Sequence, residues 1–250
     1  MARPALAEIA DPVREARIDL AAAYRIAGWL GFDDTIWNHF SLRVPGREHL
    51  FLVKRHGLLF EEITASNLLV VDRDGNVVEG DGHAERSAIC IHSRIHDTVP
   101  RAACVLHSHM RHASWLSTVK GGRVMPIHQN DLRFYGRIGY DDHFPGMATN
   151  LDEGQRIANV LGENDLAILS NHGAISIGGS VAEALYNLYY LEVSCEEQYM
   201  LACSGREPNL IPAHVAESVL ADYADEGDAP FIYLAAMKRK LLRREPDFLD

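Results

Sequence analysis

The stretch Ala102-Ala103-Cys104-Val105-Leu106-His107-Ser108-His109 gives the clearest indication of both the fold class and the functional site. Residues 102–106 form a short apolar run that is typical of a buried strand, and two histidines follow close behind it. Side chains two positions apart on a strand point to the same face, so the imidazoles of His107 and His109 can converge on one point. The segment therefore predicts a buried strand that ends in a metal chelate.

A second short strand carries a third histidine in a matching place. Residues 166–169 are again apolar, and Ser170-Asn171-His172-Gly173 follows them. Gly173 lets backbone or substrate approach closely because it has no side chain. Three neutral imidazoles suit a divalent ion such as zinc, manganese, iron or cobalt, and they leave coordination positions open for a substrate. We predict one divalent metal ion on His107, His109 and His172; the alternative is that these are ordinary structural members of a chain with 13 histidines.

Strong helix and strand signals fill the N-terminal half. Asp11-Pro12 predicts the start of a helix, because Asp11 can cap free N–H groups and proline needs no N–H at the first helical position. Gly31 suits the left-handed cap that ends such a helix. Residues 84–97 have a second helical pattern. Between the two helices, strands of an antiparallel meander are predicted at residues 40–44, 50–53 and 68–71.

The C-terminal half begins less clearly. Residues 120–150 are rich in glycine and polar groups and predict loops and short strands without definite positions. Residues 174–177 are expected to pair back against residues 166–169. Ser180-Val181-Ala182-Glu183 is a capping box that predicts a long helix to about residue 203. The final helix, from Asp228, has a basic face that either meets an acidic neighbouring subunit or is solvated, with Lys238, Arg239, Lys240, Arg243 and Arg244.

Length and charge limit the classes of protein. A chain of 250 residues with 47% hydrophobic and 24% charged residues predicts one α/β domain over residues 1–250. Its formal net charge of -11 disfavours nucleic acids and anionic membranes as partners. No run of about 18 apolar residues predicts a membrane span. Four scattered cysteines and the lack of an export signal at the N-terminus predict a cytoplasmic protein.

Four segments carry a family resemblance: Asn38-His39-Phe40-Ser41-Leu42-Arg43, residues 57–66, Val105-Leu106-His107-Ser108-His109 and Asn171-His172-Gly173. Together they resemble the class II aldolase/adducin family, and the resemblance covers nearly the whole chain. It implies a central, largely antiparallel sheet with helices on both faces, a small-molecule substrate, and a homotetramer with active sites between subunits. Residues 206–250 are then a C-terminal tail used in subunit contacts. It also implies that the three histidines are the metal ligands.

Two positions depart from the sugar-phosphate aldolases of that family. Asn38-His39 stands where they have glycine-asparagine, and His56-Gly57 stands where they have a small hydroxyl residue before the glycine. Bulky imidazoles argue against the usual phosphate cradle, whereas Lys54, Arg55 and His56 could bind a carboxylate. We therefore predict His39, Arg55, His56 and Gly57 as substrate-binding residues; the alternative is that the basic groups are simply exposed.

The acid/base glutamate of the family has an ambiguous counterpart. Alignment from the Asp74-Gly75 turn places Glu85 close to it, whereas alignment back from His107 places Ala88 there, about one helical turn away. Glu85 is predicted as the catalytic residue. The alternatives are a fourth metal ligand or a structural role, since a glutamate in the first turn of a helix is favoured by the helix dipole alone. The adducin-like bacterial branch, which residues 57–66 resemble most, includes proteins without this glutamate.

A metal-dependent lyase is the function that these residues predict. The ion would stabilise the enolate formed when a carbon-carbon bond of a hydroxy or keto acid breaks, by retro-aldol cleavage or by decarboxylation. Two other classes stay open: a non-haem iron oxygenase on the same fold, and a non-catalytic adducin-like interaction module. Four further histidines lack the strand context and are predicted to lie at the surface or to support site residues from behind: His92, His96, His112 and His128.

Overall fold

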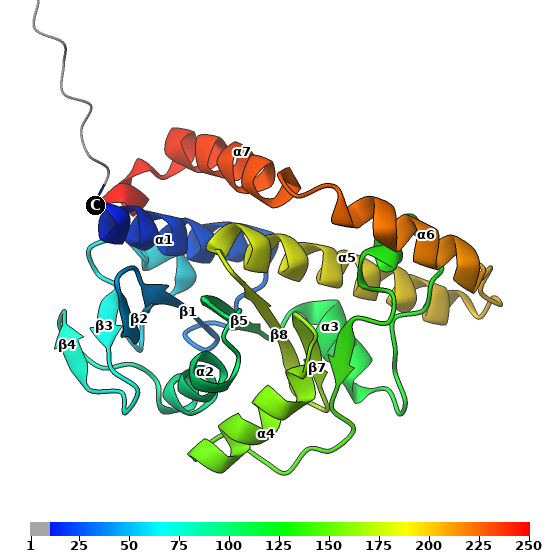
Figure 1. Cartoon of the computed structure of the whole chain (residues 1–250), viewed down its shortest axis with the longest axis horizontal. Coiled ribbons are helices and arrows are strands. Elements are labelled where there is room, and N and C mark those ends of the chain that lie inside the picture. The colour runs from blue at the N-terminus through cyan, green and yellow to red at the C-terminus, as the bar shows by residue number, and fades with distance from the viewer. Residues whose placement is uncertain (1–10) are drawn as a thin grey trace, which may run out of the picture.

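The computed structural model describes residues 11–250, which form one eight-stranded sheet with helices around it (Figure 1). The strand order is β4-β3-β2-β1-β5-β8-β7-β6, and every neighbouring pair is antiparallel except β6 and β7. The strands are β1 His39–Val44, β2 Arg47–Val53, β3 Leu69–Val71, β4 Val77–Glu79, β5 Cys104–Ser108, β6 Ile138–Tyr140, β7 Leu166–Leu169 and β8 Gly173–Gly178.

Helices cover both faces of the sheet, as predicted. One face packs on α1, α3 and α5, with α7 lying outside α1 and α5, and the other face packs on α2 and α4 (Figure 1). The helices are α1 Pro12–Leu30, α2 Arg86–Thr98, α3 Arg111–Thr118, α4 Leu151–Leu161, α5 Val181–Ser204, α6 Ala213–Ala224 and α7 Ala229–Arg244. Three short 3-10 helices complete the description: η1 Phe60–Glu62, η2 Gln129–Phe134 and η3 Pro246–Leu249.

The predicted ends of the two long helices are confirmed. Asp11 caps α1 by accepting a hydrogen bond from the N–H of Val13, and Gly31 ends that helix in the left-handed conformation. Ser180 caps α5 by accepting from the N–H of Glu183, and Gly205 ends it in the same left-handed way. These ends rest on local chemistry, which is why the sequence alone reveals them.

Side chains along β1 and β5 point alternately to the two faces of the sheet, which separates the apolar core from the polar site. Phe40 and Leu42 point to the face that α1 and α5 cover, where they join the main core. His39 points to the opposite face, under α2. In the antiparallel pairing His39 lies directly opposite His107, so the two imidazoles reach the same end of the sheet on the same face.

The C-terminal segment packs on its own chain. Arg25 on α1 forms ion pairs with Glu245 and Asp247, and Phe248 of η3 is fully buried in the main core. Part of the basic face of α7 is used within the chain: Lys238 pairs with Asp19, while Lys240 and Arg244 lie over the Trp29 ring. Residues 1–10 of the predicted domain lie outside the described part. No helix between residues 11 and 250 is both long and apolar enough to cross a membrane.

Candidate metal centre

Three imidazoles meet at one end of the sheet, as the sequence predicts. His107 is on β5, His109 lies just beyond the end of that strand, and His172 lies in the turn between β7 and β8. Their ring centroids are 4.7 to 5.0 Å apart. Each ring offers one nitrogen, and these three atoms all lie within 4.8 Å of one another. Three nitrogens so close together can share one divalent ion.

Hydrogen bonds at the other ring nitrogens orient these imidazoles. His107 Nδ1 lies 3.1 Å from the carbonyl oxygen of Ala174, so this nitrogen carries the hydrogen and Nε2 keeps its lone pair. His109 Nδ1 lies 3.0 Å from Asp34 Oδ2 in the same way. His109 Nε2 is buried and has no hydrogen-bond partner among the described residues. A buried unpaired lone pair is costly, and a bound metal ion removes that cost.

Gly173, the residue after His172, lies where its backbone comes close to the backbone at Ser108 and His109. A side chain at Gly173 would place its Cβ 2.6 Å from the backbone oxygen of Ser108 and 2.9 Å from the His109 ring. The sequence-based expectation that Gly173 permits a close approach is therefore met by the backbone beside His109.

Burial keeps two of the candidate ligands, His107 and His172, neutral. It lowers the pKa of His172 to about 4 and that of His107 well below its ordinary value, and the neighbouring imidazoles add to both shifts. Only a neutral imidazole has the lone pair that binds a metal ion. His107 and His172 are therefore in the required protonation state near pH 7.

A cavity of about 320 Å³ opens above the three histidines. None of its lining residues in the described chain is Lys or Arg. Its mouth has three exposed apolar side chains, Trp37 (48% exposed), Phe144 (46%) and Met147 (82%). Besides the three candidate ligands His107, His109 and His172, the lining consists of Asp34, Trp37, Asn38, His39, Glu85, Ser87, Phe144, Gly146, Met147, Ala148 and Asn171.

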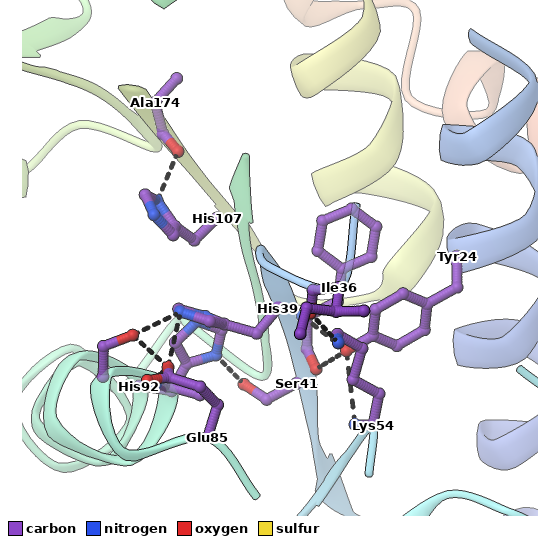
Figure 2. A network of polar contacts seen from close by, with 12 residues as sticks. Tyr24, Ile36, His39, Ser41, Lys54, Glu85, His92, His107 and Ala174 are labelled. Carbon is purple, nitrogen blue, oxygen red and sulfur yellow. Dashed lines mark hydrogen bonds and ion pairs between the residues drawn. The ribbon is translucent and has the colours of Figure 1, made fainter. Parts of the chain in front are cut away.

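Two buried polar side chains hold the backbone beside this cavity: Lys54 bonds to the loop of residues 33–38, and Tyr24 bonds to the start of β1 (Figure 2). Lys54 Nζ donates to the backbone oxygens of Ile36 (2.6 Å) and Leu58 (3.1 Å). The Tyr24 hydroxyl donates to the backbone oxygen of Phe40 at 2.7 Å. Burial lowers the pKa of Lys54 to about 8. Lys54 therefore braces the loop from inside and is not an exposed anion-binding group.

Glu85 lies in the cavity wall, although it caps α2 rather than lying within the helix. Its carboxylate accepts hydrogen bonds from the Ala88 N–H and the Ser87 hydroxyl, and it lies 3.7 Å from His39 Nε2. Burial raises the pKa of this carboxyl, but the Ser87 contacts and His39 outweigh burial, so the net shift is downward. The side chain is thus an ionised carboxylate beside His39.

The other predicted substrate-binding residues divide into two groups. His39 lines the cavity, its ring 4.9 Å from that of His107. The cavity lining does not include Arg55, His56 or Gly57. The His56 ring lies beside the ring of Trp37, a lining residue, with ring centroids 5.7 Å apart. A role for these three in binding stays a prediction.

Sequence reasoning missed one feature of the site and left a second one open. Asn38 lines the cavity, and its Nδ2 is buried without a partner in the described chain, so it can donate to a substrate oxygen. Its positive φ of 66° is unusual for a residue other than glycine, but no sequence signal specific to this role exists. His92 and His96 are buried under β1 rather than on the surface. His92 touches His39, so the alternative that it supports a site residue holds.

Comparison with known proteins agrees with this geometry. Residues 18–199 match the family model described as Class II Aldolase and Adducin N-terminal domain. The chain belongs to this family. An aldolase II superfamily protein from Pseudomonas syringae has a solved structure that is 37% identical, covers 97% of this chain and 98% of its own, and superposes with a TM-score of 0.90. The resemblance seen in the sequence is thereby confirmed.

Other class II aldolase and adducin relatives show how widely the fold is used. A Caulobacter vibrioides protein, named only as a candidate class 2 aldolase, is 35% identical over 97% of this chain and 95% of its own length. Rat alpha-adducin is 35% identical over 200 residues, which are 78% of this chain but only 27% of the adducin. L-fuculose 1-phosphate aldolase from Glaciozyma antarctica PI12, at 24% identity and a TM-score of 0.85, shares the fold over 99% of this chain and 96% of its own.

Proposed function

We propose that this protein is a divalent-metal-dependent lyase that cleaves a carbon-carbon bond of a small hydroxy or keto acid, by retro-aldol cleavage or decarboxylation. The observation that carries the proposal is the group formed by His107, His109 and His172, whose ligand atoms lie within 4.8 Å of one another at the base of a cavity. Bound zinc, manganese, iron or cobalt would supply a Lewis acid for the negative charge that develops as the bond breaks.

The donor set fits such an ion. His109 Nε2 is a buried lone pair without a partner in the described residues, and His107 Nε2 is set free by the hydrogen bond at Nδ1. Asp34 holds His109 from behind, as carboxylates behind histidine ligands do in metal sites. Because the three histidines line the cavity, an ion held by them would be accessible to a substrate there.

The cavity favours an acid with an apolar group over a sugar phosphate. A phosphate dianion needs cationic or multiple N–H donors, and the described cavity wall has no Lys or Arg. The apolar rim of Trp37, Phe144 and Met147 can instead cover a hydrocarbon or aromatic part of the substrate. We propose that Asn38 Nδ2 donates to a substrate oxygen and that Glu85 is the acid/base residue.

Elemental analysis of the purified protein tests the metal centre. We expect about one equivalent of metal per chain and its loss in His107→Ala and His172→Ala. His214→Ala is the matched control, because His214 is an exposed histidine on α6, away from the cavity. A wild-type protein that holds no stoichiometric metal, even after incubation with each of the four ions, would refute the proposal.

A substrate screen tests the reaction class. The loaded enzyme is incubated with hydroxy and keto acids that carry apolar or aromatic groups, and products are identified by mass. Lyase turnover should continue without oxygen, because neither retro-aldol cleavage nor decarboxylation consumes it. Turnover that stops under anaerobic conditions would assign the protein to the oxygenase alternative instead.

A second candidate is a non-catalytic interaction module, favoured by the 35% identity with rat alpha-adducin. Metal analysis distinguishes the two, since an interaction module has no need for a metal chelate. We also propose a cytoplasmic homotetramer in which residues 206–250 contact a neighbouring subunit. Phe231 and Ile232, which are exposed on α7, support this contact. Light scattering of the purified protein gives the mass that tests it.

A further inference from the structure

Four buried polar side chains form a row between the cavity wall and the interior beneath α2. His92 and His96 lie one helical turn apart on α2, while His39 and Ser41 lie two positions apart on β1. Both spacings put the two members on one face of their element, so the pairs interdigitate. All four side chains are buried. Buried polar groups need partners, and these four serve as partners for one another.

The hydrogen bonds of this row form one unbroken chain. Figure 2 shows its first members, with His39 turned toward His92 and His92 toward Ser41. His39 Nδ1 and His92 Nε2 are 2.8 Å apart, and His92 Nδ1 and Ser41 Oγ are 2.5 Å apart. Ser41 Oγ is 2.8 Å from His96 Nε2, and His96 Nδ1 is 2.9 Å from the carbonyl oxygen of Ala102.

The carbonyl at the inner end determines where every hydrogen lies. A carbonyl oxygen only accepts, so His96 carries its hydrogen on Nδ1 and accepts at Nε2 from the Ser41 hydroxyl. The Ser41 oxygen must then accept from His92 Nδ1, and His92 Nε2 must accept from His39 Nδ1. The rings are neutral, since burial lowers the pKa of His96 to about 4 and that of His92 well below its ordinary value. This one orientation satisfies every member of the chain.

At the cavity, the consequence is a histidine nitrogen that has no hydrogen. His39 Nε2 lies 3.2 Å from Ser87 Oγ, but the Ser87 hydroxyl donates to the Glu85 carboxylate. The lone pair of Nε2 thus has no remaining donor among the described residues. We propose that His39 Nε2 accepts a hydrogen bond from a hydroxyl group of the substrate, and that His92, Ser41 and His96 are positioning residues that hold His39 in this tautomer.

This inference rests on the proposed function for the kind of substrate, and it refines that substrate. A nitrogen without a hydrogen, 3.7 Å from the Glu85 carboxylate, repels a substrate carboxylate. His39 therefore selects a hydroxylated substrate, and the substrate-binding role predicted for it becomes the binding of a hydroxyl group. Asn38 Nδ2, a buried donor in the same wall, is the group suited to the carboxylate or carbonyl oxygen.

NMR of protein labelled with 15N-histidine tests the tautomer without any substrate. Long-range 1H–15N spectra distinguish a protonated ring nitrogen from an unprotonated one, and His39→Gln identifies the His39 signals by their loss. We expect wild-type His39 to carry hydrogen on Nδ1 alone. Hydrogen on Nε2 in the wild-type protein would overturn the inference, and this measurement needs no variant other than the one used for assignment.

Two substitutions of His96 test the positioning role. His96→Leu removes the acceptor for Ser41, which frees the serine to donate to His92 and reverses the chain, so His39 should change to the Nε2–H tautomer. His96→Gln keeps a donor for Ala102 and an acceptor for Ser41 and should retain the wild-type tautomer. A His39 tautomer that is the same in wild type and His96→Leu would refute the positioning role.

Mandelate and phenylacetate, which differ by one hydroxyl group, test the substrate contact by calorimetry on the protein as isolated. We expect His96→Leu to weaken mandelate binding about tenfold, the effect of one lost hydrogen bond, and to leave phenylacetate unchanged; His96→Gln should bind both like wild type. Equal wild-type affinities for the two acids, or absence of binding by both, would overturn the hydroxyl contact. A protein that lacks metal or turnover refutes the proposed function. The NMR result on the His39 tautomer does not depend on that function, so the two failures can be distinguished.

Discussion

Asp34 Oδ2 lies 3.0 Å from Nδ1 of His109, although the two residues are 75 positions apart in the chain. Asp34 belongs to the loop before β1, and His109 follows the end of β5. The contact fixes the imidazole so that its buried Nε2 faces the other two histidines. A residue outside the proposed ligand set therefore orients one of the histidines of the candidate metal centre.

Asp34→Ala should weaken metal binding by about 10- to 100-fold, the usual effect of losing a carboxylate behind a histidine ligand. Asp34→Asn keeps an acceptor for His109 and should fall at the lower end of that range. Competition with a chelator measures both affinities. Asp33→Asn is the matched control, because it removes the neighbouring negative charge without touching His109. Equal affinities for wild type and Asp34→Ala would contradict the orienting role.

Gly173→Ala should damage the site through packing alone. The added Cβ would lie 2.6 Å from the Ser108 backbone oxygen, so the turn must shift and move His109 with it. We expect a loss of about 1 to 3 kcal/mol in the free energy of unfolding, typical of overpacking, together with weaker metal binding. Urea denaturation and chelator competition measure these effects. Gly227→Ala, where nothing lies within 4 Å of the new Cβ, should change neither.

His96 should make the protein less stable in mild acid. Burial lowers its pKa to about 4 from the ordinary 6.5, so the unfolded chain binds a proton at this residue below pH 6.5 while the folded chain stays neutral. The stabilising contribution is therefore complete above pH 6.5 and is lost as the pH falls toward 4. Between pH 7 and pH 5 the wild type should lose about 2 kcal/mol more unfolding free energy than His96→Gln.

Urea unfolding at pH 7, 6 and 5 measures this difference. Comparing the two proteins cancels the titration of all other histidines, including the three of the metal centre. His214→Gln, at an exposed position, should keep the wild-type pH dependence. If His96→Gln also has the wild-type pH dependence, His96 is protonated in the folded protein and the chain of neutral rings is wrong.

Helices and strands with capping residues or a clear apolar pattern could be predicted from the sequence. A short strand that depends on pairing with a distant segment could not. α1 and α5 have capping residues at both ends, and the predicted β7 and β8 pair antiparallel as expected. β6, in the stretch left unplaced, has three residues and exists because it pairs in parallel with β7. Such a strand depends on a partner distant in sequence, so no local pattern predicts it.

The candidate site shows the same division. His107, His109 and His172 could be predicted because two strands end in histidines. The buried state of His92 could not, because its partners His39 and Ser41 come from a strand about 50 residues earlier. Only the pairing of α2 with β1 makes these imidazoles interior groups.

Arg25 should anchor the C-terminal segment. Its buried guanidinium bonds to the backbone oxygen of Ile63 and to the carboxylates of Glu245 and Asp247. Arg25→Met should lower the unfolding free energy by about 2 to 3 kcal/mol; a fully buried pair would lose more, but both carboxylates are partly exposed. Denaturation and limited proteolysis measure the loss and the release of the segment. Arg239→Met, an exposed change on α7, should have no effect.

The burial of Phe248 in the main core limits how the C-terminus can be shortened or extended for expression. Its backbone oxygen also accepts a hydrogen bond from the Ala65 N–H, in the segment between η1 and β3. Removing even the last three residues would therefore expose apolar core surface and break this hydrogen bond. Truncated versions should therefore retain residue 248, and any purification tag at this end needs a flexible spacer after Asp250. A shortened protein that aggregates would reflect this exposed core and would say nothing about catalysis.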